Sequence, residues 1–244
     1  MEVTLAAEKL FSIGPIPITN SLLTTWIVTF ILITFALVST RKITKVPQGL
    51  QNFAEAAVET FADLVSSIAG EKTKVFLPIV ASFFFFILLG NYFGLLPGIG
   101  SVGFWEIDHG KETFVPLFRA INSDLNTTAA LAIVSLIATH YLSIKYLGLN
   151  GYLGKFFSLN PIFLFVGLLE LIGEATKILS LSFRLFGNIF AGEVLLTTAS
   201  TKLFAFVVPI PFYFLELLVG FVQALIFSIL TLVFMVILTQ KQSH

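Results

Sequence analysis

The chain has 244 residues, of which 57% are hydrophobic and only 11% are charged, and its 14 Lys and Arg residues balance its 14 Asp and Glu residues. A soluble domain carries about 25% charged residues, so this composition argues against a water-soluble globular fold. The zero net charge argues against a nucleic-acid binder, which needs a basic face. Without cysteine there is no disulfide framework or thiolate site, and we expect neither a metal nor a cofactor. These observations predict a polytopic membrane protein.

The first 40 residues contain one membrane span. Residues 1–18 lack the apolar core of a signal peptide and include Glu2, Glu8 and Lys9. Residues 19–39 have no charge and are rich in Ile, Leu and Phe. About 20 apolar residues cross the hydrocarbon core of a bilayer, so we predict the first membrane helix at 19–39.

Residues 48–69 have the pattern of an amphipathic helix. Apolar residues recur at steps of three and four from Leu50 to Ile68, and Glu55, Glu59 and Asp63 occupy the other face. This periodicity predicts a helix in the plane of the membrane interface. Because its polar face is acidic, attraction to lipid headgroups explains it poorly, and packing against a partner subunit is an equal alternative.

Two further spans are predicted from uncharged segments. The second covers 75–96 and ends before Pro97 and Gly98, where a polar loop follows. The third covers 124–147 and begins with Asp124.

The last two predicted helices, 161–201 and 212–240, are longer than a bilayer is thick. Asn160-Pro161 is typical of a helix start, and no proline follows before Pro209. A helix over 161–201 would be ~60 Å long, against a hydrocarbon core of ~30 Å. We therefore predict a hairpin of two long, strongly tilted membrane helices. The expected fold is an all-α integral membrane protein, one domain over 1–244, with three ordinary transmembrane helices, one amphipathic interfacial helix and this hairpin.

Basic residues are divided unequally between the two sides of the predicted spans. The side that holds the C-terminus has eight of them: Arg41, Lys42, Lys45, Lys72, Lys74, Lys145, Lys155 and Lys241. The other side has four: Lys9, Lys111, Arg119 and Lys202. Because Lys and Arg accumulate in cytoplasmic loops, we expect a cytoplasmic C-terminus and an external N-terminus.

Six charged residues interrupt the last two segments: Glu170, Glu174, Lys177, Arg184, Glu193 and Glu216. A charge at mid-membrane costs at least ~2.5 kcal/mol, so such residues pair with one another or mark an ion path. At about 100° per residue, Lys177, Asn188 and Glu170 lie within about 40° of Arg184 and form one polar stripe. Glu193 points to the opposite side, where it can meet Glu216. Gln223 shares the face of Glu216.

Acids on both sides of Arg184 suggest two separate aqueous paths with a positive barrier between them. Arginine suits this barrier because its guanidinium does not deprotonate in proteins. Two close carboxylates repel unless they share a proton, so Glu193 and Glu216 together favour a functional interpretation.

Structural interpretations stay open for the other polar residues. The alternatives are an ion pair of Arg184 with a glutamate and an intrahelical ion pair of Glu174 with Lys177. Asn188 and Gln223 are also compatible with contacts between helices, and Asp124 with capping of its helix. His140 and the Phe83–Phe86 run are interpreted as packing residues.

The stretch around Arg184 resembles a known signature. Ser180-Leu-Ser-Phe-Arg184-Leu-Phe-Gly-Asn188-Ile-Phe-Ala-Gly-Glu193 is similar to that of subunit a of F-type ATP synthases. The resemblance spans nearly the whole chain and includes Asp124-Leu-Asn126 and Gln223-Ala-Leu-Ile-Phe. It implies a stator subunit of the proton channel, in a bilayer, whose partners are a ring of c subunits, the peripheral-stalk b subunits and the rest of the complex.

The resemblance also implies a role for each matching residue. Arg184 corresponds to the essential stator arginine, which attracts each ring carboxylate and blocks a leak between two half-channels. Asn188 and Gln223 correspond to its polar neighbours. Glu193 and Glu216 correspond to the external half-channel, and Asp124 to an acid near its entrance. The cytoplasmic half-channel corresponds to Glu170, Lys177 and Ser180. Glu174 lies on the same side as these three residues. Many family members have a glutamate and a histidine where this chain has two acids, which implies a coupled pair with shared pKa values.

Two other classes of protein are less consistent with the sequence. A secondary transporter has internal pseudo-symmetry, and no repeat is visible here. A membrane scaffold has no reason to concentrate acids around one intramembrane arginine. The chain has no nucleotide-binding loop, so we expect ATP chemistry to occur in partner subunits, and we expect a bacterial plasma membrane, with a thylakoid-type membrane as the alternative.

Overall fold

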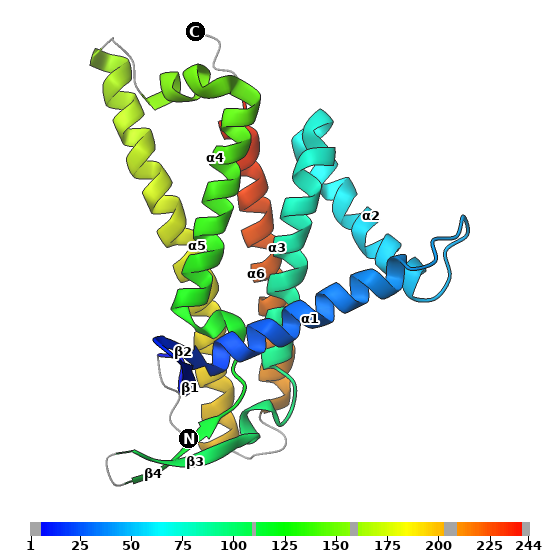
Figure 1. Cartoon of the computed structure of the whole chain (residues 1–244), viewed down its shortest axis with the longest axis vertical. Coiled ribbons are helices and arrows are strands. Elements are labelled where there is room, and N and C mark those ends of the chain that lie inside the picture. Colours follow the sequence, from blue (N-terminus) through cyan, green and yellow to red (C-terminus); the bar gives the residue numbers. More distant parts are fainter. Residues whose placement is uncertain (1–5, 109–110, 157–160, 203–208, 241–244) are drawn as a thin grey trace.

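The structure is a computed structural model, and it describes residues 6–108, 111–156, 161–202 and 209–240. Figure 1 shows its elements. The helices are α1 (Asn20–Thr40), α2 (Leu50–Ala69), α3 (Thr73–Gly94), α4 (Leu125–Phe156), α5 (Pro161–Lys202) and α6 (Pro209–Leu238). The strands are β1 (Lys9–Ile13), β2 (Ile16–Thr19), β3 (Gly103–Asp108) and β4 (Lys111–Pro116), and short 3-10 turns lie at Gly70–Lys72 (η1), Ile99–Ser101 (η2) and Ile121–Ser123 (η3).

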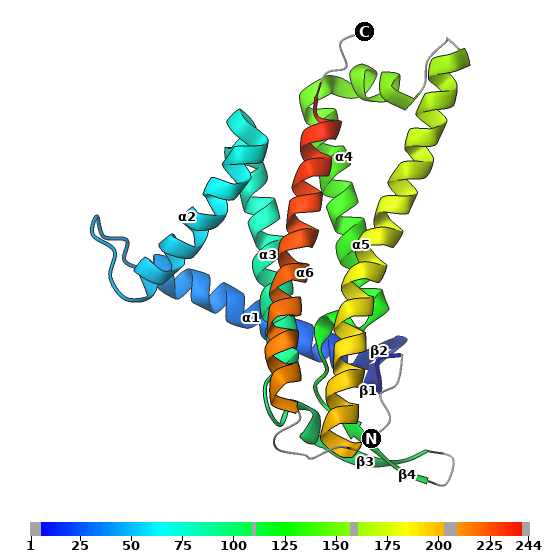
Figure 2. The same ribbon diagram turned by 180° about the vertical axis from the view of Figure 1, so that it is seen from behind.

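Four long helices form the body of the molecule. α3, α4, α5 and α6 run side by side, whereas α1 crosses them at a steep angle and extends away from them (Figures 1 and 2). Within the described residues, four stretches are long and apolar enough to cross a membrane: Asn20–Thr40, Leu50–Gly94, Leu125–Phe156 and Pro209–Leu238. α5 is not in this set, although at 42 residues it is the longest of the described helices. A helical membrane protein with long C-terminal helices is therefore confirmed.

Two short β-hairpins, which the sequence did not predict, accompany the helices of this all-α membrane protein. β1 and β2 form an antiparallel hairpin around Gly14, whose φ of 60° suits glycine. β3 and β4 form a second one, in which the rings of Trp105 and Phe114 lie 5.4 Å apart across the strands. Strands this short have too few alternating residues to stand out in a sequence, and cross-strand pairing stabilises them.

Two helix ends differ from the sequence-based ranges for identifiable reasons. α4 extends to Phe156 but is kinked at Gly148, whose φ is 73°. The predicted span 124–147 ends directly before this kink. α6 begins at Pro209, before the expected start at 212, because prolines in the first turn of a helix lose no intrahelical hydrogen bond.

The core lies mainly between α3 and α6. The rings of Phe83 and Phe227 are 5.5 Å apart, and the Asn91 side chain donates to the Gly220 carbonyl at 2.9 Å. On the other side of α3, Phe61 of α2 stacks on Phe84 at 4.7 Å. The apolar face of α2 therefore packs partly on α3, and the Phe83–Phe86 run contributes to packing as expected.

The last turn of α6 is held by three side chains from other elements. Lys72 donates to the Thr239 carbonyl at 2.9 Å, and Lys155 donates to the Leu238 carbonyl at 2.7 Å. Ser143 also donates to the Leu238 carbonyl, at 2.8 Å. Two ammonium groups thus lie at the negative end of the helix dipole, where cations are stabilising. Lys241, counted with the basic side of the chain, lies outside the described residues.

Candidate functional site

Arg184 lies on the exposed side of α5, in an apolar setting. Its Nη2 donates to Ser180 Oγ at 3.2 Å, one turn earlier on the same helix. Leu179 and Phe183 beside it are 57% and 55% exposed. Asn188 is also exposed and follows Arg184 by one turn. Arg184 forms no ion pair with any acid in the parts of the chain that the structure describes.

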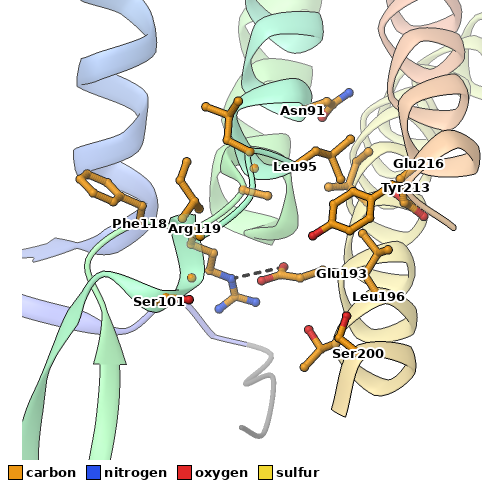
Figure 3. A pocket seen from close by; sticks show the side chains of 18 residues that line it. Asn91, Leu95, Ser101, Phe118, Arg119, Glu193, Leu196, Ser200, Tyr213 and Glu216 are labelled. Carbon is orange, nitrogen blue, oxygen red and sulfur yellow. Dashed lines mark ion pairs between the residues drawn. The ribbon is translucent and has the colours of Figure 1, made fainter. Parts of the chain in front are cut away.

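A cavity of about 300 Å³ lies on one side of Arg184 along α5. Its walls come from α3, the following segment with η2, the segment before η3, α5 and α6. Its polar lining includes Asn91, Arg119, Glu193, Tyr213 and Glu216. Figure 3 shows Glu193 and Glu216 on neighbouring helices at this cavity. The structure therefore brings together the two acids that sequence reasoning placed across the hairpin.

Arg119 is a cavity residue that the sequence analysis did not single out. Its Nε lies 3.8 Å from Glu193 Oε2, the pair drawn as a dashed line in Figure 3. The guanidinium is 5% exposed and donates to Ser123 Oγ at 3.0 Å and to the Ala6 carbonyl at 2.8 Å. A fixed positive charge therefore faces the more exposed of the two acids. The one sequence signal is a lone arginine within an apolar stretch, Pro116-Leu-Phe-Arg119-Ala-Ile.

Glu216 occupies a tighter position than Glu193. Its side chain is 4% exposed, against 30% for Glu193. The Glu216 carboxylate lies directly against Gly192 of α5, where a Cβ would overlap it. Glycine at this position therefore lets α6 bring a carboxylate up to the backbone of α5.

Three other predicted residues lie away from the cavity lining. Asp124 accepts from the Asn126 backbone N–H at 3.1 Å, so it caps α4, and it also accepts from Ser21 Oγ at 2.9 Å. Gln223 is buried on α6, and Asn188 lies on the exposed face of α5. None of the three is among the residues that line the cavity.

A second polar cluster lies on the opposite side of Arg184. Lys177 Nζ donates to Glu174 Oε1 at 2.7 Å, so the intrahelical ion pair is present. His140 of α4 reaches this pair, with its Nε2 3.7 Å from Glu174 Oε2, and its Nδ1 shares a hydrogen bond of 2.9 Å with the Tyr152 hydroxyl. The interpretation of His140 as a packing residue is therefore incomplete. Glu170 is half-buried one turn before Glu174, and Ser180 is exposed.

The order of these groups along α5 places Arg184 between two polar clusters. It is ten positions after Glu174 and nine before Glu193, or ~15 Å from each along a helix. The fold and this arrangement of charges define a polytopic membrane protein with ionisable side chains inside its helix bundle.

Comparison with known proteins specifies the family. Residues 22–236 match the family model of the ATP synthase A chain. The chain is 35% identical over 226 residues to ATP synthase subunit a of Moorella thermoacetica, covering 93% of each chain. It is 36% identical over 223 residues to ATP synthase subunit a of Gloeobacter violaceus, covering 91% of this chain and 84% of the relative. The chain belongs to the ATP synthase A chain family, so it is a non-catalytic, proton-translocating membrane subunit of an ATP synthase.

Proposed function

We propose that this chain is the stator of the proton channel, and that Arg184 holds each deprotonated carboxylate of a rotating ring of c subunits while protons move to and from the ring through two half-channels. The observation that carries this proposal is an exposed arginine between two polar clusters of α5, with no acidic partner in the described residues. A guanidinium in an apolar surface needs a counter-charge. A ring carboxylate that has lost its proton would supply it, and the exposed Leu179 and Phe183 would pack on the ring.

The external half-channel follows the cavity in this proposal. Glu193 and Glu216 line it and are the two titratable groups, and Arg119 holds Glu193 in place. Asn188 and Gln223 are assigned to the polar surroundings of Arg184. Asp124 is assigned to the external side of the path, where its hydrogen bonds favour a structural contribution.

The cytoplasmic half-channel is assigned to Glu170, Glu174, Lys177 and Ser180. Ser180 is hydrogen-bonded to Arg184 and exposed, and Glu170 is half-buried farther along α5. Glu174 is instead tied to Lys177 and His140, which favours a structural contribution beside this path. The path would therefore run along the outer face of α5 and be closed by the ring.

The orientation in the membrane follows from charge and helix length. The basic residues around the end of α6, Lys72 and Lys155 among them, favour a cytoplasmic C-terminus and an external N-terminus. If α1 stands upright in the bilayer, α5 and α6 are strongly tilted, since α1 crosses them steeply. We assign the whole chain to one membrane domain of a bacterial plasma membrane, with the b subunits and the rest of the ATP synthase as further partners.

The mechanism couples proton flow to rotation. A proton enters past Glu193 and Glu216 and neutralises a ring carboxylate, which can then turn into lipid. A loaded site that arrives from the other direction releases its proton past Ser180 and Glu170, while Arg184 holds the emptied carboxylate. The membrane potential supplies about 2.3 kcal/mol per charge per 100 mV. ATP synthesis itself would take place in partner subunits.

The test replaces Arg184 in the assembled complex. Arg184→Ala should abolish ATP-driven proton pumping into inverted membrane vesicles, because no fixed charge attracts the ring carboxylate. Arg184→Lys is the matched control for charge, and it should also fail to pump at the wild-type rate because an ammonium can deprotonate in an apolar site. Pumping by Arg184→Ala at the wild-type rate, with normal assembly, would contradict the proposal.

A further inference from the structure

A second cavity, of about 370 Å³, lies where α1 ends and α2 begins. The polar residues that line it are Ser39, Arg41, Lys42, Thr44, Gln48 and Gln51. Two of them are cations and none is an acid, so the cavity presents a net positive charge to any ligand. It is remote from Arg184 and from both polar clusters of α5, and the proposed proton path does not use it.

One buried hydroxyl in this cavity has no hydrogen-bond partner. The Ser39 side chain is only 5% exposed, and its Oγ has no partner among the described residues. The neighbouring Thr40 instead donates back to the Ala36 carbonyl at 2.7 Å, as hydroxyls in helices often do. Leaving a buried hydroxyl without a partner is unfavourable, because the group has lost its hydrogen bonds to water. A ligand oxygen that accepts from Ser39 would remove this cost.

Within the described residues, Gln51 bonds to Thr44 and Glu55 and not to the two cations, which are therefore available to a ligand. Gln51 is fully engaged, because its amide donates to the Thr44 carbonyl at 3.0 Å and to Glu55 at 2.7 Å, while its oxygen accepts from the Thr44 N–H at 3.2 Å. These bonds hold the loop in shape. They also occupy the Glu55 carboxylate, the first acid of α2, which does not line the cavity. Arg41 and Lys42 are exposed at its mouth.

The surroundings of the cavity are those of a lipid interface. α1 is a candidate span whose apolar side chains face outward, with Phe30 71% and Leu37 66% exposed. In the loop that follows, Ile43 and Val46 are 73% and 71% exposed, directly beside the cations. Exposed apolar side chains next to Lys and Arg at the end of a membrane helix are typical of the boundary between acyl chains and headgroups.

We infer that this cavity binds the headgroup phosphate of an anionic phospholipid, with Arg41 and Lys42 pairing with the phosphate, Ser39 donating to it, and the acyl chains lying along α1. A zwitterionic lipid fits less well, because its ammonium group would meet two cations and no carboxylate. A free phosphate would use the same donors but would leave Ile43 and Val46 without an apolar partner.

The test uses the assembled complex in nanodiscs of phosphatidylcholine with a trace of photoactivatable phosphatidylglycerol. Cross-linked peptides are mapped by mass spectrometry, and residues 38–51 should be labelled. Arg41→Gln with Lys42→Gln should reduce this labelling roughly 30-fold, since each base near an anionic surface contributes about 1 kcal/mol. Lys45→Gln with Lys74→Gln is the matched control: it removes two bases of the same side that do not line the cavity, and it should reduce labelling clearly less than the cavity pair does.

Three results would overturn the inference. Equal labelling by a photoactivatable phosphatidylcholine would show a non-selective lipid contact. Equal loss in the two double variants would show diffuse attraction to a charged surface. Competition by millimolar inorganic phosphate, but not by unlabelled phosphatidylglycerol, would show a phosphate site. ATP-driven pumping should be retained by both double variants, which would show that the complex has assembled.

Discussion

The two polar regions of α5 differ in how tightly the surrounding side chains pack around their acids. The region around Glu193 is an open cavity, in which Arg119 lies 3.8 Å from one acid and a second acid, Glu216, lies on the facing helix. The region around Glu174 is tighter, with Glu174 4% exposed, the Lys177 contact at 2.7 Å and His140 close by. The first pair of acids therefore lines a cavity, whereas Glu174 is buried against a cation of its own helix.

A carboxylate in a membrane segment is therefore not by itself evidence of a channel residue. Glu174 has its counter-charge within its own helix, so its burial is compensated locally. Glu216 has no such cation among the described residues, and it persists next to a cavity. In the proposed mechanism, the cytoplasmic path accordingly uses groups on the outer face of α5, whereas the external path follows the cavity inside the chain.

The strongest test concerns the close approach of α5 and α6. Gly192→Ala places a methyl group where the Glu216 carboxylate lies, so the helices must separate or the carboxylate must move. We expect near-complete loss of ATP-driven proton pumping in inverted vesicles. Gly173→Ala is the control on the same helix, because a Cβ there meets nothing within 4 Å. Equal pumping by the two variants would contradict the tight contact.

Neutralising Glu193 and Glu216 one at a time should separate their roles. Glu216→Gln should slow pumping at least about tenfold, because a positioned proton-transfer group contributes about 10²–10⁴-fold. Glu193→Gln should have a smaller effect, since Glu193 is 30% exposed and water can reach the cavity there. Co-purification of the complex measures assembly, and Glu59→Gln on the exposed face of α2 is the control. Loss of assembly in either cavity variant would instead indicate a structural role.

Arg119 should affect stability and transport to different extents. Arg119→Gln removes the charge facing Glu193 and the hydrogen bonds of the guanidinium to the Ala6 carbonyl and to Ser123, at a cost of about 1–3 kcal/mol. We expect a lower thermal unfolding temperature of the complex and slower pumping. Arg119→Lys should recover pumping more than stability, because it restores the charge but not the hydrogen-bonding fork. Lys9→Gln, also on the predicted external side, should change neither.

The smallest effect is expected at the His140 cluster. His140→Phe and Tyr152→Phe each remove the same 2.9 Å hydrogen bond, worth about 1 kcal/mol, and pumping should change less than about twofold. The double variant should cost little more than His140→Phe alone, because His140→Phe already removes the bond that Tyr152→Phe would remove. Additive losses in thermal stability would contradict this shared hydrogen bond, and a large loss of pumping in His140→Phe would contradict a structural role for the cluster.

The sequence predicts most of the helices because long uncharged segments and periodic apolar residues are local signals. The span predicted at 124–147 ends at Gly148, where the backbone turns, and the first membrane helix expected at 19–39 corresponds to α1. The grouping of Glu193 and Glu216 also follows from helical spacing plus the assumption of a hairpin. Composition and periodicity thus suffice wherever one helix, or one pair of adjacent helices, determines the outcome.

The parts that sequence reasoning missed depend on contacts between distant segments. Arg119 meets Glu193 only because the loop before η3 packs on α5. His140 meets Glu174 because α4 and α5 lie side by side, and Tyr152 joins them after the kink at Gly148. A glycine at position 192 is unremarkable in the sequence, and its importance depends on the position of a carboxylate from α6.

The three side chains that hold the last turn of α6 give this helix the mechanics of a beam clamped at one end. Lys72 and Lys155 fix the Thr239 and Leu238 carbonyls from two different elements. A sideways load on α6 should therefore displace the N-terminal end of the helix more than its last turn. If this chain works against a rotating ring, as proposed, the last turn is the fixed point about which the rest of α6 can bend.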